Sequence, residues 1–181
     1  MKQCILLTGN AGTGKDTVAA YLVSKYGYKK LAFADALKKV SIILFNLPND
    51  VEYYNNRKRK EKKIKNCKYS PREMWQILGE QMRNVFYQEI WIDNVLSKCN
   101  NIDKIVISDC RYDNESIQVK KRIKNAKLWK IVRPKFTGDV GLTNGKEKHA
   151  SERGLTVKED CLLVNNGSKK NLYKEIDKLM Q

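Results

Sequence analysis

The sequence contains no run of about 18 apolar residues, which argues against a membrane-spanning helix. A strand-like segment begins almost at the first residue, and this argues against a cleaved signal peptide. The five cysteines, Cys4, Cys67, Cys99, Cys110 and Cys161, are scattered and form no Cys-x-x-Cys pair. We therefore expect a reduced, cytoplasmic protein whose thiols are mostly buried and form no zinc site.

The chain also lacks internal repeats and linkers rich in proline or serine, so its 181 residues predict one domain with a sizeable core. Acidic residues are few, and the net charge is +16. Residues 57–68, "RKRKEKKIKNCK", contribute +7 from eight bases and one acid, which leaves 16 − 7 = +9 for the remainder. The charge indicates phosphate-bearing ligands or nucleic acid, while residues 57–68 could equally be a solvated insertion without a partner.

Short apolar segments alternate with amphipathic ones, the pattern of an α/β domain with a five-stranded parallel sheet. The predicted strands are residues 3–8, 28–34, 103–109, 127–133 and 161–166. The predicted helices are residues 15–25, 35–47, 70–87, 89–98, 114–124 and 169–180.

Details of three helices follow from side-chain spacing and capping residues. The first has Val18, Ala19, Leu22 and Val23 on one side, and the second begins at a capping Asp35. The apolar face of the second consists of Leu37, Val40, Ile43, Leu44 and Leu47. The third starts with Ser70 as N-cap, Pro71 in the first turn and Glu73 in a capping box.

Ligands of such sheets bind beyond the carboxyl ends of the strands. This rule predicts one shared site for Gly9–Thr17, Asp35, Asp109–Arg111, Arg133 and Asn165–Ser168.

The segment "TGNAGTGKDT" (8–17) contains Gly9-x-x-x-x-Gly14-Lys15 between a predicted strand and a predicted helix. Backbone N–H groups from Gly9 to Lys15 would surround phosphate oxygens, and Lys15 would reach the β- and γ-phosphates. Asp16 stands where Ser or Thr is usual. Either Asp16 is a Mg²⁺ ligand, direct or through water, or it only favours the helix dipole and Thr17 has the metal role.

This loop resembles the Gly-Lys-Asp-Thr variant of phage and viral deoxynucleoside monophosphate kinases, within the nucleoside-monophosphate-kinase group of P-loop folds. Other stretches agree in order: "FADALKK" (33–39), "SPREMWQILGEQMR…EIWIDNVL" (70–96), "ISDCRYDNE" (107–115), "HASERGL" (149–155) and "CLLVNNGS" (161–168). The similarity covers nearly the whole chain, except residues 52–68 and 134–148.

The resemblance implies a P-loop three-layer fold that phosphorylates deoxynucleoside monophosphates with ATP and Mg²⁺, in the host cytoplasm if the protein is viral, as a monomer or homodimer. The implied core is residues 1–48, 99–133 and 150–181, the acceptor-binding helical insertion is 49–98, and the lid is 134–149. The implied ATP-binding residues are Gly9, Asn10, Ala11, Gly12, Thr13, Gly14, Lys15, Asp16 and Thr17, with Asn165, Asn166 and Gly167 near the adenine.

Phosphoryl transfer to a phosphate needs no strong general base, because the acceptor is already ionised, with a second pKa of about 6. The absence of a Ser/His/Asp arrangement is therefore no obstacle. Catalysis depends on positioning and charge neutralisation. The expected catalytic residues are Lys15, Asp16, Arg83, Asp109, Arg111 and Arg133, with Asp16, Thr17 and Asp109 as candidate metal ligands.

The residues expected at the acceptor are Asp35, Lys38, Arg72, Trp75, Arg83, Trp91, Arg111 and Glu152. Several have structural alternatives: the tryptophans can be core residues, Lys38 can be solvated, and Asp109 with Arg111 can stabilise a turn. His149 is interpreted as a hydrogen-bonding hinge of the lid.

Two other functions fit the residues. Phosphomevalonate and dephospho-coenzyme A kinases share the loop and parts of the closing motifs. A nucleic-acid-binding P-loop NTPase would use residues 57–68 as its contact surface.

Overall fold

The protein is represented by a computed structural model that describes residues 2–50, 56–65, 67–134 and 149–181. Their contacts define two compact units. The first consists of Met1–Ala32 with Val95–Gln181, and the second of Phe33–Asn94.

The first unit is built on a five-stranded sheet in the order β2-β3-β1-β4-β5, in which every neighbouring pair is parallel. Its strands are β1 (Gln3–Thr8), β2 (Lys29–Leu31), β3 (Lys104–Ile107), β4 (Asn125–Val132) and β5 (Cys161–Val164). This confirms the predicted five-stranded parallel sheet. Two strands are much shorter than expected: β2 has three residues instead of the predicted segment 28–34, and β3 has four instead of 103–109.

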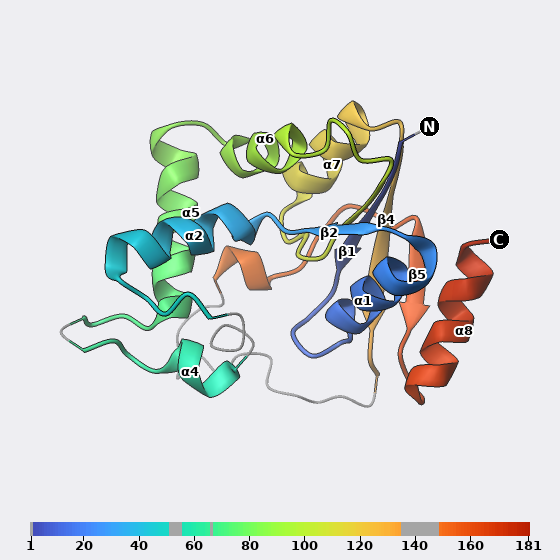
Figure 1. Cartoon of the computed structure of the whole chain (residues 1–181), viewed down its shortest axis with the longest axis horizontal. Coiled ribbons are helices and arrows are strands. Elements are labelled where there is room, and N and C mark those ends of the chain that lie inside the picture. The colour runs from blue at the N-terminus through green and yellow to red at the C-terminus, as the bar shows by residue number, and fades with distance from the viewer. Residues whose placement is uncertain (1, 51–55, 66, 135–148) are drawn as a thin grey trace. The chain divides into compact units, whose positions relative to one another are not determined.

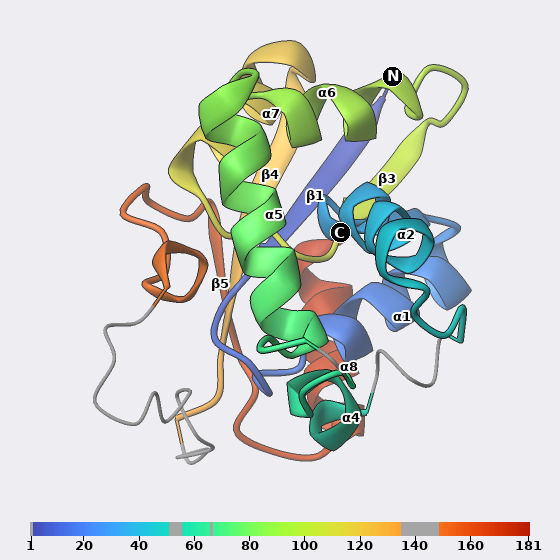
Figure 2. The same ribbon diagram turned by 90° about the vertical axis from the view of Figure 1, so that its left-hand side faces the viewer.

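Helices cover both faces of this sheet, as in Figures 1 and 2. One face carries α1 (Lys15–Tyr26) and α8 (Lys169–Leu179), and the opposite face carries α7 (Asp113–Arg122). A 3₁₀ turn, η1 (Ala150–Glu152), precedes β5. Alternate residues of the central strands therefore face different helices, which explains why β1 and β3 are buried and apolar on both sides.

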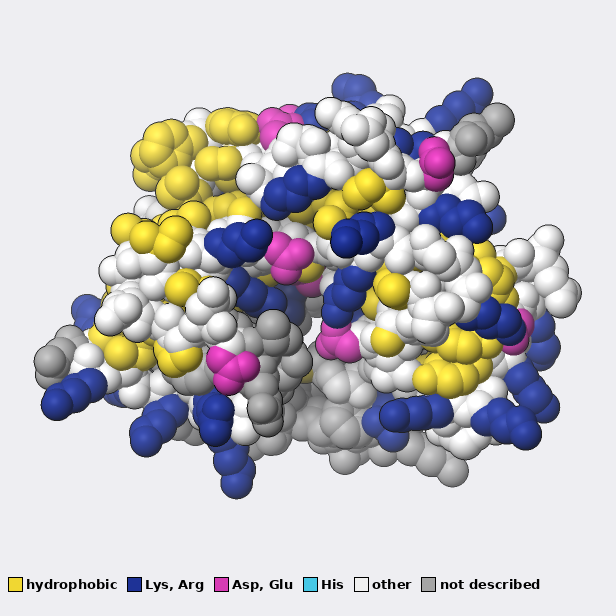
Figure 3. Space-filling model, viewed as in Figure 1, with side chains coloured by type: hydrophobic (Ala, Val, Ile, Leu, Met, Phe, Trp, Pro, Cys, Tyr) yellow, Lys and Arg dark blue, Asp and Glu magenta, His cyan; other side chains and the backbone are white. Residues whose placement is uncertain are grey.

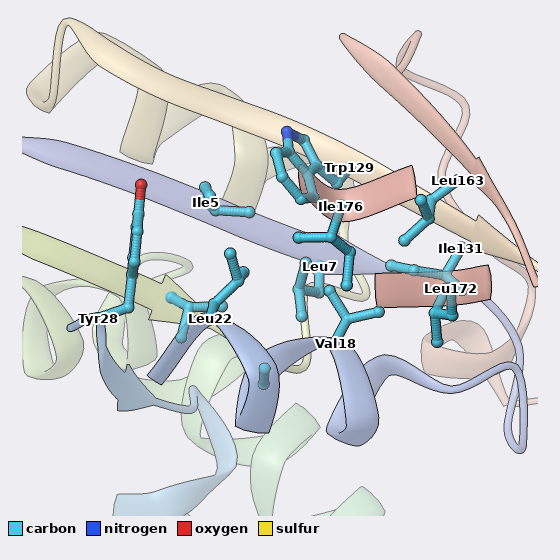
Figure 4. Close-up of a cluster of buried hydrophobic side chains, with 12 residues drawn as sticks. Ile5, Leu7, Val18, Leu22, Tyr28, Trp129, Ile131, Leu163, Leu172 and Ile176 are labelled. Atoms are coloured by element: carbon cyan, nitrogen blue, oxygen red, sulfur yellow. The ribbon is translucent and has the colours of Figure 1, made fainter. Parts of the chain in front are cut away.

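The apolar cluster between the sheet, α1 and α8 is drawn in Figure 4. Its members are Ile5, Leu7, Val18, Ala19, Leu22, Tyr28, Val106, Trp129, Ile131, Leu163, Leu172 and Ile176. A fully buried aliphatic or aromatic side chain contributes roughly 1.5–3 kcal/mol, so this cluster is a main source of stability for the unit. Val18, Ala19 and Leu22 confirm the predicted face of α1, but Val23 is 40% exposed and its predicted burial is wrong.

Helices α1 and α8 are also joined at their surface. The rings of Tyr21 and Tyr173 stack with centroids 3.9 Å apart. The Asp177 carboxylate accepts hydrogen bonds from Lys25, from Tyr26 at 2.7 Å and from Tyr21 at 2.9 Å. These bonds, that of Lys25 first, hold the pKa of Asp177 below its usual value. The contacts tie the helix that follows the phosphate loop to the last helix of the chain.

The second unit consists of helices α2 (Ala34–Phe45), α4 (Arg57–Glu61) and α5 (Pro71–Val85), and α6 (Ile90–Ser97) continues from it into the first unit. Helix α5 begins with the predicted capping box: Ser70 Oγ accepts from the Glu73 N–H, and Glu73 accepts from the Ser70 N–H at 2.8 Å. Trp91 is buried and its indole donates to the Gly79 carbonyl at 3.0 Å.

Two predictions for α2 are wrong. Phe33, not Asp35, is the N-cap, and Asp35 lies inside the first turn, where an acid still favours the helix dipole. The predicted apolar face is buried only at Leu37 and Leu47, whereas Ile43 is 81% exposed. The buried side instead includes Ser41, whose hydroxyl donates to the Leu37 carbonyl at 2.8 Å. Because that bond satisfies the hydrogen-bonding capacity of the serine hydroxyl, a polar residue can occupy this buried position.

The surface is strongly basic, in keeping with the net charge of +16. Lys and Arg side chains are spread over the face shown in Figure 3 and outnumber Asp and Glu there. Part of this charge lies on α4, where Lys58 and Arg59 are exposed. No helix within the described residues has the length and hydropathy needed to cross a membrane.

Candidate active site

The phosphate loop joins β1 to α1, and its glycines adopt conformations that other residues rarely take. Gly9, Gly12 and Gly14 have φ values of 136°, 79° and 107°. A Cβ atom on Gly9 would lie 2.3 Å from the Ile131 carbonyl oxygen, so the loop passes directly against the backbone of β4. All three positions therefore favour glycine by their backbone conformation, and Gly9 also leaves no room for a side chain. This is expected of a loop that offers backbone N–H groups to a ligand.

Lys15 folds back over this loop. Its ammonium donates to the carbonyls of Gly9 at 2.6 Å and Asn10 at 2.8 Å. Burial, and then the charge of Arg111, lower the pKa of Lys15 from 10.5 to about 8, although Asp16 and Asp109 raise it. Arg111, Asp16 and Asp109 are therefore near enough to Lys15 for their charges to affect its pKa.

Asp16 lies at the surface of the protein. Its side chain is 88% exposed and accepts from Lys30 on β2 at 2.8 Å. Because both partners face water, this ion pair contributes little to stability, and the carboxylate stays accessible.

The oxygen donors near the loop fit magnesium chemistry. The described residues contain no group of three His, Cys, Asp or Glu side chains that could hold a metal alone. Mg²⁺ needs none, because with nucleotides it takes one or two carboxylates and completes its shell with phosphate oxygens and water. Asp16 or Thr17, with Asp109, stay the predicted candidates for holding it.

The turn after β3 positions Arg111. Glu115 is buried, and its carboxylate accepts from the N–H groups of Arg111 at 2.7 Å and Tyr112 at 3.1 Å. The guanidinium of Arg111 is exposed and donates to the Ser151 carbonyl at 3.4 Å. The sequence alone assigned no role to Glu115. Its position in the first turn of α7, where an acidic side chain often binds the backbone N–H groups before the helix, could have indicated one.

The segment after η1 is fastened to the same turn. The Asp113 carboxylate accepts from the N–H groups of Thr156 at 2.9 Å and Val157 at 3.1 Å, and from the Thr156 hydroxyl. Arg111 and Asp113 therefore bind residues on both sides of Arg153, some 40 positions later in the chain.

Asn165, the first residue after β5, also contacts the phosphate loop. Its side-chain amide donates to the Thr13 carbonyl at 2.9 Å. Asn166 and Gly167 follow and are exposed. Arg133 likewise follows its strand, β4, and is exposed. The parallel sheet places these residues at the same edge as the loop, as predicted.

The candidate acceptor residues Asp35, Lys38, Arg72, Trp75, Arg83 and Trp91 all belong to the second unit. Lys38 lies 6.0 Å from the Trp75 ring centroid. Arg72 contacts Glu61 at 3.4 Å. Arg83 donates to the Gly79 carbonyl at 3.2 Å, the same oxygen that Trp91 contacts. That these residues share a site with the phosphate loop stays a prediction.

The predicted lid lies almost entirely outside the described residues, as does the side chain of Glu152. His149 is described: its Nδ1 accepts from the Ser151 N–H at 3.2 Å and lies 2.9 Å from the Ser151 hydroxyl. It caps η1, which agrees with a structural hydrogen-bonding residue.

A parallel α/β sheet with a glycine-lysine phosphate loop at its carboxyl edge defines a P-loop protein that binds nucleotide phosphates. The solved structure of TT1252 from Thermus thermophilus shares the fold, with a TM-score of 0.54 and 16% identity over 99% of this chain and 96% of that one. The dephospho-CoA kinase from Campylobacter jejuni matches with a TM-score of 0.48 and 15% identity, over 100% and 96% of the two chains.

The sequence comparisons are more specific. A family model described as deoxynucleotide monophosphate kinase matches residues 42–176. A protein of Acanthamoeba polyphaga mimivirus, provisionally named deoxynucleotide monophosphate kinase, is 32% identical over 190 residues, covering 94% of this chain and 92% of that protein. The chain belongs to the deoxynucleotide monophosphate kinase family. This confirms the resemblance inferred from the motifs.

Proposed function

We propose that this nucleotide kinase transfers the γ-phosphoryl group of ATP to a deoxynucleoside monophosphate, with Mg²⁺ as the metal. The observation that carries the proposal is the glycine-lined loop with the Lys15 ammonium bonded to its carbonyls and with Arg111, Asp16 and Asp109 near enough to affect the Lys15 charge, in a chain of this family. It combines the cations that two phosphates require with the oxygen donors that magnesium requires.

On the donor side, the N–H groups of Gly9–Thr17 and the Lys15 ammonium bind the triphosphate. The two carbonyls that Lys15 now contacts hold its ammonium beside the loop, so that little reorganisation precedes phosphate binding. Asn166 and Gly167, at the same sheet edge, are proposed to contact the adenine.

Bound magnesium would neutralise charge on the transferred phosphoryl group. Asp16, Thr17 and Asp109 are the residues proposed to hold it. The pair between Asp16 and Lys30 is weak and exposed, so it presents only a small barrier to a metal role for Asp16.

On the acceptor side, Arg111 is proposed to bind the acceptor phosphate, with Arg83 as a second clamp. A guanidinium makes two parallel hydrogen bonds to phosphate, which suits both roles. Arg133 adds positive charge at the strand edge. The remaining proposed acceptor contacts are Asp35, Lys38, Arg72, Trp75, Trp91 and Glu152.

We propose the same roles for the segments of the chain as those expected from the sequence. Residues 1–48, 99–133 and 150–181 are proposed to form the catalytic core, 49–98 the acceptor-binding insertion and 134–149 a lid that excludes water. No residue is required as a general base, because the acceptor phosphate is already ionised near neutral pH.

A coupled ADP-release assay tests the proposal. The acceptors are dAMP, dCMP, dGMP and dTMP, their ribo forms, phosphomevalonate and dephospho-coenzyme A. We expect ADP release that depends on at least one deoxynucleoside monophosphate and on Mg²⁺. Release only with phosphomevalonate or dephospho-coenzyme A would reassign the substrate, and release without any acceptor would indicate an NTPase.

A further inference from the structure

Asn165 joins two parts of the nucleotide site that are 152 positions apart in the sequence. Its backbone N–H donates to the Val132 carbonyl at 2.7 Å, which continues the pairing of β4 with β5. Its side-chain amide donates to the Thr13 carbonyl at 2.9 Å. Asn165 is therefore fixed by the sheet through its backbone and binds a backbone carbonyl of the phosphate loop through its side chain.

This contact controls the orientation of one peptide group. In a trans peptide the C=O and the N–H point in opposite directions. The Thr13 carbonyl belongs to the same peptide as the Gly14 N–H, so a bond that holds this carbonyl toward Asn165 also directs that N–H away from it. The Gly14 N–H is one of the backbone donors that a phosphate loop offers to its ligand.

The contact also depends on Gly14 being glycine. A Cβ atom on Gly14 would lie 2.6 Å from the Asn165 amide nitrogen. Gly14 has a φ of 107°, a conformation that side chains disfavour. The missing side chain leaves the space in which the amide approaches the loop, so Gly14 and Asn165 fit as a pair.

We propose that Asn165 is a positioning residue for phosphate binding: its amide holds the Thr13–Gly14 peptide so that the Gly14 N–H faces the phosphates of the donor. This rests on the proposed function, because it assumes that the loop binds a polyphosphate. It differs from a contact with the adenine base, the role that the family resemblance implies for residues after the last strand.

The test distinguishes a role of Asn165 in phosphate binding from a contact of Asn165 with the adenine base. Asn165→Leu removes the donor at similar volume, and Asn165→Asp replaces the donor by an oxygen with little change in size. Binding of inorganic tripolyphosphate, of ATP and of adenosine is measured by calorimetry in the presence of Mg²⁺. The matched control is Asn101→Leu, because Asn101 is exposed in the loop before β3.

We expect Asn165→Leu to weaken tripolyphosphate and ATP binding by roughly two- to tenfold, the effect of losing one hydrogen bond. Asn165→Asp should weaken both further, because its carboxylate repels the Thr13 carbonyl and the phosphates. Adenosine binding and the control should not change. In ¹⁵N–¹H spectra, tripolyphosphate should shift the Gly14 amide in wild type and much less in Asn165→Leu.

Unchanged tripolyphosphate binding in folded Asn165→Leu, with a wild-type Gly14 shift, would overturn the proposal. So would weakened adenosine binding with tripolyphosphate unaffected, because Asn165 would then contact the base. If wild type binds neither tripolyphosphate nor ATP, the proposed function itself is contradicted, because the loop then binds no polyphosphate. Wild-type ADP release with a monophosphate separates the two cases.

Discussion

The phosphate loop and helix α2 are held by different kinds of contact. The loop is fixed by its own backbone: Gly9 passes the Ile131 carbonyl, and Lys15 and Asn165 bond to loop carbonyls. Helix α2 keeps much of its apolar surface in water, with Ile43 81% and Leu44 61% exposed. Backbone constraints are specific to residue type, whereas an apolar helix face can be buried or exposed according to its neighbours. Substitutions should therefore be far more costly in the loop.

The largest effect is expected for Lys15→Ala, which removes the only side-chain cation in the loop. Phosphoryl transfer should fall about 10²- to 10³-fold, the loss typical when one donor to developing charge is removed. The thermal midpoint should stay close to wild type, and Lys121→Ala on the exposed end of α7 serves as the matched control. Near-normal turnover would contradict the assignment of the loop.

Gly9→Ala and Gly154→Ala compare two glycines with positive φ. Both substitutions add the strain of a left-handed residue, about 1–2 kcal/mol. Only Gly9 adds a clash with backbone, since nothing lies within 4 Å of a Cβ on Gly154. Urea unfolding should show a loss larger by about 2 kcal/mol for Gly9→Ala. Equal losses would mean that the loop moves freely away from β4.

Arg111→Ala should raise the KM for the monophosphate about ten- to hundredfold and change the KM for ATP less than about twofold. The reason is the loss of a charge-assisted bond to the acceptor, worth roughly 1.5–3 kcal/mol. Initial-rate kinetics with each substrate varied in turn provide the measurement. A larger change in the KM for ATP would move Arg111 to the donor side.

The affinity for ATP should depend on pH through Lys15. Its pKa in the free protein is about 8, and bound phosphate favours the charged form and so raises that pKa. Affinity should therefore be level below pH 8 and fall by up to about tenfold per pH unit above it. Calorimetry from pH 6.5 to about 9.5 checks this, and Lys15→Arg should remove the dependence. A flat wild-type profile would show that Lys15 is not buried as described.

The smallest effects are expected in the second unit. Ser70→Ala removes the N-cap of α5 and should lower the free energy of unfolding by about 1 kcal/mol. Ile43→Gln on the exposed side of α2 should change it by less than about 0.5 kcal/mol. Urea denaturation of both variants provides the comparison. A loss above about 2 kcal/mol for Ile43→Gln would show that another surface covers this side of α2.

Much of the first unit could be read from local signals. The strand β1, the glycine-lysine loop, helix α1 and its end at Gly27 follow each other closely, and each has its own residue signature. The capping box at Ser70 was equally local and was predicted correctly. The burial of Val23 and the cap at Asp35 were wrong, because helical spacing alone does not say how wide the packed side is or where the preceding turn begins.

The sequence alone determined the sheet class, the phosphate loop and the family of the protein, because these depend on short-range patterns of glycine, charge and apolar spacing. Tertiary structure decided which side of α2 is buried, that Glu115 orients the backbone of Arg111, and that Asn165 holds the Thr13 carbonyl. The bond from Asn165 joins residues more than 150 positions apart, and that separation is bridged only when β4 and β5 pair beside β1. No local pattern encodes such a contact, because its geometry comes from the assembled sheet.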